Sequence, residues 1–117
     1  MGMKYNEIIG KVRAVYPNGY TDEEMLGWIL EVNSDIRRNV EKNQVIHKKL
    51  TGTENAIIPP PYDTMYMYYI LAQIAYHQKD FDSYKKHIEK YYSGKNGYMA
   101  YYIRTNGSER TVFKGWI

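Results

Sequence analysis

The 117-residue sequence contains no cysteine. This excludes a disulfide framework and a metal site built on thiolates. It also lacks an apolar run of the roughly 20 residues that a membrane-spanning helix needs, and its opening residues are too polar for a signal peptide. The length suits one small domain. We therefore expect a protein that does not enter a membrane and that is synthesised in a cytoplasm.

A strong excess of one charge is also missing. Sixteen Lys and Arg stand against thirteen Asp and Glu, a net charge of +3. Dedicated duplex binders usually carry a pronounced basic face. Sequence-independent DNA binding is therefore not demanded by the composition.

Motifs for catalysis and for metal binding are absent. We find no P-loop, dinucleotide fingerprint, nucleophile elbow or paired catalytic carboxylate. The stretch that begins at Asp80 fails as a calcium loop, because Lys85 stands where glycine is needed and Tyr91 where the bidentate Glu should be. The three histidines show no metal-binding spacing. We expect no enzyme activity and no cofactor.

Tyrosine, in contrast, is abundant: fourteen residues against two Phe. The helical periodicity of the apolar residues predicts a first helix over about 4–15 and a second over about 22–40. The second begins with a capping box, in which Thr21 is the N-cap and Glu24 follows three residues later. Its apolar stripe is Met25, Ile29, Val32, Ile36 and Val40.

Residues 41–61 lose the helical period. A short strand-turn-strand and an irregular loop fit this segment equally well. Lys42, Lys48 and Lys49 are its candidate ligand-binding cations, and a solvated loop is the simpler interpretation.

A third helix is predicted after three consecutive prolines, from the N-cap Asp63 to about Lys79. Residues 65–72 are apolar or tyrosine on every side, which is typical of the central helix of a core. Three other helices in so small a domain leave part of it for a neighbouring subunit to cover.

The fourth helix is predicted over about 81–103. The apolar face keeps its phase across Ser93–Gly97, which favours one continuous helix with Gly97 on the polar side. Lys95 alone interrupts the apolar face, where it can snorkel to solvent. Residues 106–117 lack a helical period and form a predicted extended tail, whose candidate partner-binding residues are Arg110, Phe113, Lys114, Trp116 and Ile117.

The tyrosines allow two interpretations, a stacking platform for nucleic acid and buried packing. Tyrosines at helical spacing among aliphatic residues are more often buried. We therefore assign seven of them to the core or to a subunit interface: Tyr62, Tyr66, Tyr68, Tyr69, Tyr91, Tyr98 and Tyr102. The predicted fold is all-α: a four-helix domain over 1–105 with a long C-terminal helix, a loop or small hairpin between its second and third helices, and the extended tail.

Three stretches carry a family resemblance: VYPNGYTDEEMLGWILEVNSDI, IIPPPYDTMYMYYILAQIAYHQKDFDSY and YMAYYIRTNG. In order and spacing they resemble head-tail connector (adaptor) proteins of tailed bacteriophages and prophages of Gram-positive bacteria. The most specific part is the Pro61-Tyr62-Asp63 step that opens a tyrosine-rich helix. Another matching part is the Tyr101-Tyr102 pair followed by Arg104-Thr105.

The resemblance implies a structural virion protein of the neck, made in the cytoplasm of the bacterial host. Connectors of this kind form a ring of about a dozen copies beneath the portal, prolong the DNA channel, and bind neck or tail-completion proteins. It further implies that the tail holds the portal protein. The basic loop with Lys42, Lys48 and Lys49 would then face DNA that passes without sequence-specific binding.

A second hypothesis is a small helical DNA-binding or regulatory protein of a phage. It would use Arg37, Arg38, Lys48 and Lys49 as phosphate contacts.

Overall fold

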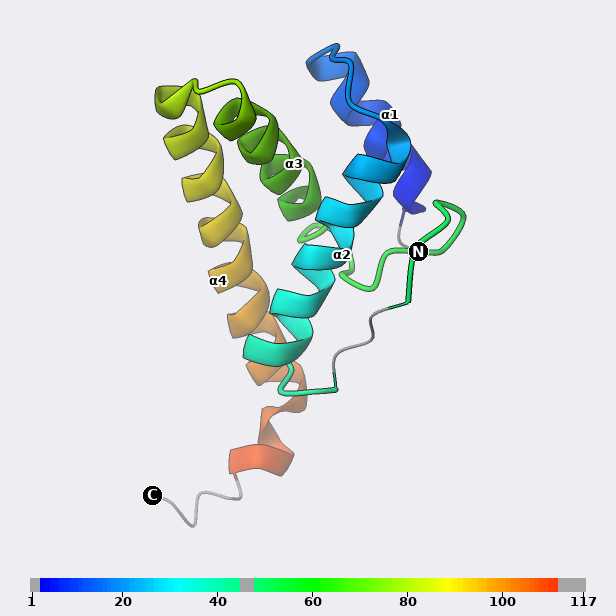
Figure 1. Cartoon of the computed structure of the whole chain (residues 1–117). Coiled ribbons are helices and arrows are strands. Elements are labelled where there is room, and N and C mark those ends of the chain that lie inside the picture. The colour runs from blue at the N-terminus through cyan, green and yellow to red at the C-terminus, as the bar shows by residue number, and fades with distance from the viewer. Residues whose placement is uncertain (1–2, 45–47, 112–117) are drawn as a thin grey trace.

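The computed structural model describes residues 3–44 and 48–111, with side chains described through residue 106. Its helices are α1 (Tyr5–Val15), α2 (Asp22–Asn39), α3 (Thr64–His77) and α4 (Phe81–Thr111). Within these residues there is no β-strand, and the predicted all-α, four-helix architecture is confirmed (Figure 1).

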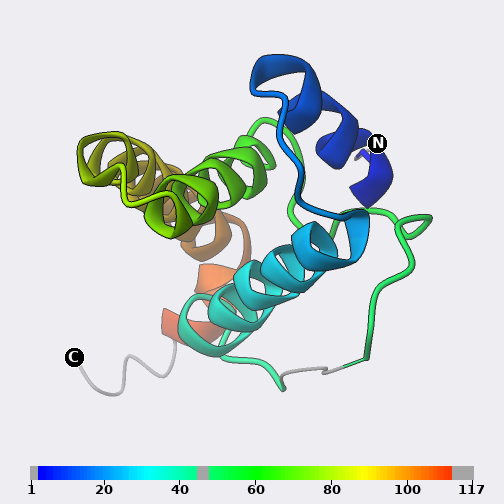
Figure 2. The ribbon, with the colours of Figure 1, turned by 45° about the horizontal axis from the view of Figure 1, so that its top comes forward.

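Helix α3 is the central helix, because it packs against each of the other three. It forms an antiparallel hairpin with α4, while α2 lies along its other side and α1 lies across one end of α2 and α3 (Figure 2). The sequence predicted this central place from the apolar character of residues 65–72. Met65, Tyr66, Ile70 and Ala72 are indeed fully buried.

The predicted apolar stripes of the first two helices form the rest of the core. Every residue of the α2 stripe is buried, and the Thr21–Glu24 capping box is present with reciprocal hydrogen bonds of 3.1 and 2.8 Å. In α1, Tyr5, Ile8, Ile9 and Val12 are buried. The predicted stripe was wrong at Val15, which is 62% exposed because it ends α1 at the edge of the packed region.

The start of α3 differs from its prediction in one respect. Asp63 is the N-cap residue, as expected, but its side chain makes no capping hydrogen bond. Its backbone is already in the right-handed helical region, since a turn over residues 60–63 leads directly into the helix. This turn lets the N–H groups of Met65 and Tyr66 bond the carbonyls of Tyr62 and Asp63.

Helix α4 is continuous through Ser93–Gly97, as the phase of its apolar face predicted, and it ends at Thr111 rather than near 103. Residues 106–111 are therefore helical where an extended tail was predicted. Thr105 and Asn106 explain the continuation, because their side chains donate hydrogen bonds to carbonyls of Tyr101 and Tyr102 within the same helix. Such residues can also start a turn, so the sequence alone is ambiguous here.

The glycines of α4 lie on a different side from the one predicted. Gly97 contacts the Tyr62 ring, and a Cβ atom added to Gly94 would lie 3.3 Å from Met65 Cβ. The missing side chains let α3 and α4 approach closely. Gly97 was expected on the polar side because the sequence does not show how broad the contact with α3 is.

The segment between α2 and α3 is a loop in its described residues, and the alternative of an internal hairpin is not formed there. Its partner is the N-terminal segment. The Ala56 N–H donates to the Met3 carbonyl at 2.8 Å, and the Tyr5 N–H donates to the Glu54 carbonyl at 3.2 Å. Gly52 turns the loop with a φ of 103°, a conformation that favours glycine.

Candidate functional site

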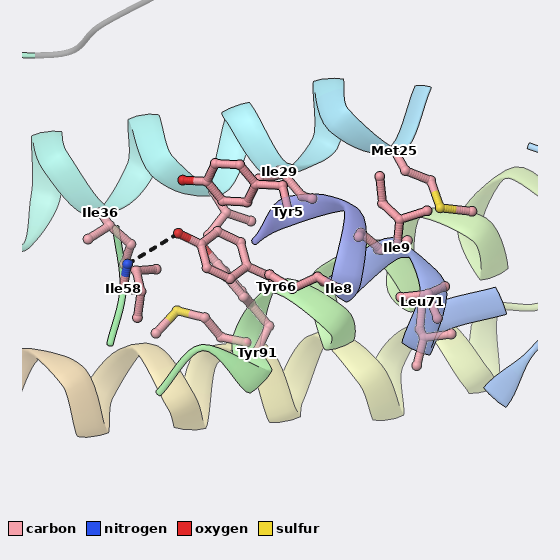
Figure 3. Close-up of a cluster of buried hydrophobic side chains, with 14 of the residues drawn as sticks. Tyr5, Ile8, Ile9, Met25, Ile29, Ile36, Ile58, Tyr66, Leu71 and Tyr91 are labelled. Atoms are coloured by element: carbon pink, nitrogen blue, oxygen red, sulfur yellow. Dashed lines mark hydrogen bonds between the residues drawn. The ribbon is translucent and has the colours of Figure 1, made fainter. Parts of the chain in front are cut away.

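The tyrosines of α3 and α4 form two polar arrangements inside the domain, and the first is centred on Tyr66. This fully buried residue donates a 2.6 Å hydrogen bond to Asn33 Oδ1 and accepts one from the Ile58 N–H, shown in Figure 3. Asn33 in turn donates to the Tyr5 hydroxyl at 2.9 Å. Burial raises the pKa of Tyr66 well above its ordinary value. This network joins α1, α2, α3 and the loop.

The second arrangement, the tyrosine–carboxylate network, joins α2 to the α3–α4 hairpin. Three tyrosine hydroxyls each donate to one carboxylate of α2, over 2.6 to 2.8 Å. Lys95 Nζ adds a 2.9 Å ion pair to Asp35 and is largely buried, so it pairs within the domain and does not reach solvent as predicted. The hydroxyl–carboxylate pairs are Tyr69–Glu31, Tyr91–Asp35 and Tyr98–Glu41.

The network sets the ionisation of its members. Burial opposes the charge on Asp35, yet hydrogen bonds from Tyr91, Lys95 and Asn39 together hold the pKa of that carboxyl below its ordinary value. Burial, reinforced by the carboxylate that each hydroxyl faces, raises the pKa of Tyr69, Tyr91 and Tyr98. The carboxylates are charged and the tyrosines neutral at pH 7, which suits a structural role.

The remaining predicted tyrosines are half-buried. Tyr62 packs against Tyr98 and Tyr101, Tyr102 packs against Tyr98, and the Lys90 ammonium lies 5.3 Å from the centre of the Tyr68 ring. The isolated chain thus covers much of the tyrosine surface itself. Stacking with nucleic acid is disfavoured, since these rings already pack against protein groups.

The predicted apolar face of α4 is wider than the domain covers. Its inner part, which includes Tyr91 and Tyr98, is buried, whereas Phe81, Tyr92 and Ile103 are 57, 52 and 52% exposed. We call the uncovered edge the α4 outer stripe; its members are Phe81, Ile88, Tyr92, Met99 and Ile103. Its exposure leaves an apolar surface available to a partner.

A second surface lies where α1 ends beside the α3–α4 turn, and we call it the tip pocket. Exposed Val15 and Tyr16 border it, Leu71 and Ala75 line its floor, and its volume is about 200 Å³. Tyr16 donates to Gln78 Oε1 at 2.7 Å. The remaining lining residues are Asp80, Ser83 and His87.

The basic loop is less available to DNA than its composition indicated. Lys49 Nζ pairs with Glu23 at 2.7 Å, and Arg37 pairs with Glu41 at 3.6 Å. Lys42 and Lys48 are exposed, and so is Arg38. Two of the five cations are thus already neutralised by acidic neighbours.

The predicted tail residues fall at the edge of the described chain or beyond it. Arg110 belongs to α4 by its backbone, and its side chain lies outside the described residues. Phe113, Lys114, Trp116 and Ile117 lie outside them as well, as do Val45, Ile46 and His47 of the loop.

A search of the described residues finds no group of three or more His, Cys, Asp or Glu side chains that could hold a metal ion. Within the same residues, no helix combines the length and the apolar character that crossing a bilayer requires.

Sequence reasoning did not single out Asn33, Glu31, Asp35 or Glu41, although they bind four of the predicted tyrosines. A signal was present, since Glu31 and Asp35 stand four residues apart beside the buried α2 stripe. Such a pair is equally typical of a solvated helix face.

Comparisons of the chain with protein-family models, with curated proteins and with solved structures find no match.

Proposed function

We propose that this protein is a structural component of a phage neck, a head-tail connector that forms a ring beneath the portal and joins head to tail. The observation that carries the proposal is the pair of uncovered apolar surfaces, the tip pocket and the α4 outer stripe. Large apolar residues exposed in groups are typical of protein–protein contacts. The motifs at Pro61-Tyr62-Asp63 and Arg104-Thr105 supply the connector resemblance.

The charge distribution supports a channel that lets DNA slide. Exposed Lys42 and Lys48 attract phosphates, whereas the pairing of Lys49 with Glu23 and of Arg37 with Glu41 limits the number of contacts. Few phosphate contacts mean weak, salt-sensitive attraction without sequence readout.

The C-terminal residues 112–117 are the proposed contact with the portal protein, and a deletion tests this. Because α4 ends at Thr111, removing residues 112–117 leaves the helix whole. We expect the shortened protein to keep its helical circular dichroism and thermal stability but to be missing from portal-containing particles. Normal incorporation into particles would refute the portal assignment.

The alternative, a DNA-binding regulator, is tested by a mobility shift of duplex DNA at several salt concentrations. A regulator with several phosphate contacts shows a steep fall of affinity with salt. The variant Lys42→Ala/Lys48→Ala must then weaken binding, with Lys11→Ala on the far helix α1 as its control. Binding that is absent at low salt eliminates this alternative and leaves the connector proposal intact.

A further inference from the structure

The α4 outer stripe has a regular spacing that points to its partner. Its five members follow one another at 7, 4, 7 and 4 residues, so the pattern repeats every 11 residues. Eleven residues complete three helical turns with about 20° to spare, because each residue turns by about 100°. The stripe therefore runs almost parallel to the helix axis over about 33 Å.

A straight apolar stripe of this length matches another long helix. Within the described residues, α1, α2 and α3 have 11, 18 and 14 residues, whereas α4 has 31. The most exposed positions are also symmetric, since Phe81 and Ile103 each lie 11 residues from Tyr92. When two α4 helices pack antiparallel, Tyr92 therefore meets its own copy and Phe81 meets Ile103 of the second copy.

Charged neighbours at the two ends favour the antiparallel direction. Asp82 follows Phe81 and Arg104 follows Ile103, both are exposed, and within the described residues neither forms an ion pair. The antiparallel arrangement brings Asp82 close to Arg104 of the second copy at both ends. A parallel, in-register arrangement would place like charges together and would align the two helix dipoles.

We propose that the free protein forms a two-fold symmetric dimer in which the α4 outer stripes of two copies pack antiparallel about Tyr92. The inference does not rest on the connector proposal. A two-fold contact closes at two copies, whereas a ring needs two different surfaces that match each other. The dimer is thus a form of the protein outside any ring, and it covers Phe81, Tyr92 and Ile103 there.

The first test measures the association of the purified full chain by sedimentation equilibrium. Tyr92→Glu places two negative charges at the two-fold axis and should weaken dimerisation by about tenfold or more. Val15→Glu is the matched control, because Val15 is equally exposed but lies off the stripe. Circular dichroism checks that both variants fold. A wild-type protein that is monomeric at every concentration overturns the proposal.

A charge exchange tests the direction of packing. Asp82→Arg and Arg104→Asp should each weaken the dimer, and the variant that carries both should recover it, because each new pair again joins opposite charges. Recovery fails in a parallel dimer, where like charges still meet.

The absence of cysteine allows a second test of geometry. Under mild oxidation, Tyr92→Cys should give a disulfide-linked dimer by itself. Phe81→Cys alone and Ile103→Cys alone should not, because the identical positions lie about 33 Å apart in an antiparallel pair. An equimolar mixture of the two should cross-link. Efficient cross-linking of Phe81→Cys alone would contradict the antiparallel arrangement.

Discussion

The Tyr91 hydroxyl of α4 donates a 2.6 Å hydrogen bond to Asp35 Oδ2 of α2. Asp35 also accepts hydrogen bonds from Lys95 and Asn39, so three donors converge on one carboxylate. Helix α4 packs extensively against α3, whereas its bonds to α2 are made by long polar side chains. The tyrosine–carboxylate network therefore fixes how the hairpin sits against α2.

We predict that Tyr91→Phe lowers the free energy of unfolding by about 1–2 kcal/mol, because hydrogen bonds to charged groups contribute more than neutral ones. The matched control is Tyr92→Phe, whose hydroxyl lies on an exposed residue with no hydrogen-bond partner among the described residues. It should change stability by less than about 0.5 kcal/mol. Denaturant unfolding measures both, and equal effects would contradict the role of the network.

The stability of the protein should depend on pH through Asp35. Its pKa is lower in the folded state than the ordinary 3.8, so its contribution is complete above that value and is lost as the pH falls through the lower folded pKa. Asp35→Asn cannot take up this proton. The difference in stability between wild type and Asp35→Asn should therefore shrink as the pH is lowered from neutral into this acidic range. Unfolding curves that stay equally far apart at all pH values would rule this out.

The buried Tyr66 network should be more sensitive than any exposed tyrosine. Tyr66→Phe leaves Asn33 Oδ1 and the Ile58 N–H without their partner inside the core. An unsatisfied buried polar group costs about 1–3 kcal/mol. Thermal unfolding should show a clear loss for Tyr66→Phe and almost none for Tyr68→Phe, whose ring is half-buried and whose hydroxyl has no hydrogen-bond partner in the described part of the chain. The assignment fails if the two variants unfold alike.

Two helical glycines should respond differently to alanine. Gly27 of α2 is exposed, and an added Cβ meets nothing within 4 Å, so Gly27→Ala should stabilise the protein by about 0.5–1 kcal/mol. At Gly94 the added Cβ lies 3.3 Å from Met65 Cβ, which offsets the same gain. Gly94→Ala should therefore be less stabilising than Gly27→Ala, and Gly94→Leu should be clearly destabilising. An equal gain at both positions would mean that α3 and α4 are not closely packed there.

Much of the fold could be predicted from periodicity alone. The α2 stripe, the Thr21–Glu24 capping box and the central place of α3 follow from patterns that the chain shows locally. The errors lie where a neighbour decides. Val15 has the right spacing but no cover, and Gly97 sits in a close contact that only the position of Tyr62 reveals.

The site was less predictable because a tyrosine's ring and its hydroxyl answer to different partners. Helical spacing correctly indicated that Tyr66, Tyr91 and Tyr98 are buried. Their hydrogen-bond partners, however, lie 33, 56 and 57 residues away on α2, and no local pattern pairs them. The loop behaves similarly, since the partner of residues 54–56 is the N-terminal segment and not the loop itself.

The continuity of α4 makes this helix a molecular ruler. From Phe81 to Thr111 it sets a distance of about 45 Å between the α3–α4 turn and the start of residues 112–117. Removing or adding residues within α4 would change that distance by about 1.5 Å each while rotating everything beyond by about 100°. Only a change of 11 residues would keep the orientation nearly constant, so natural variants of different reach should differ in α4 by multiples of 11 residues.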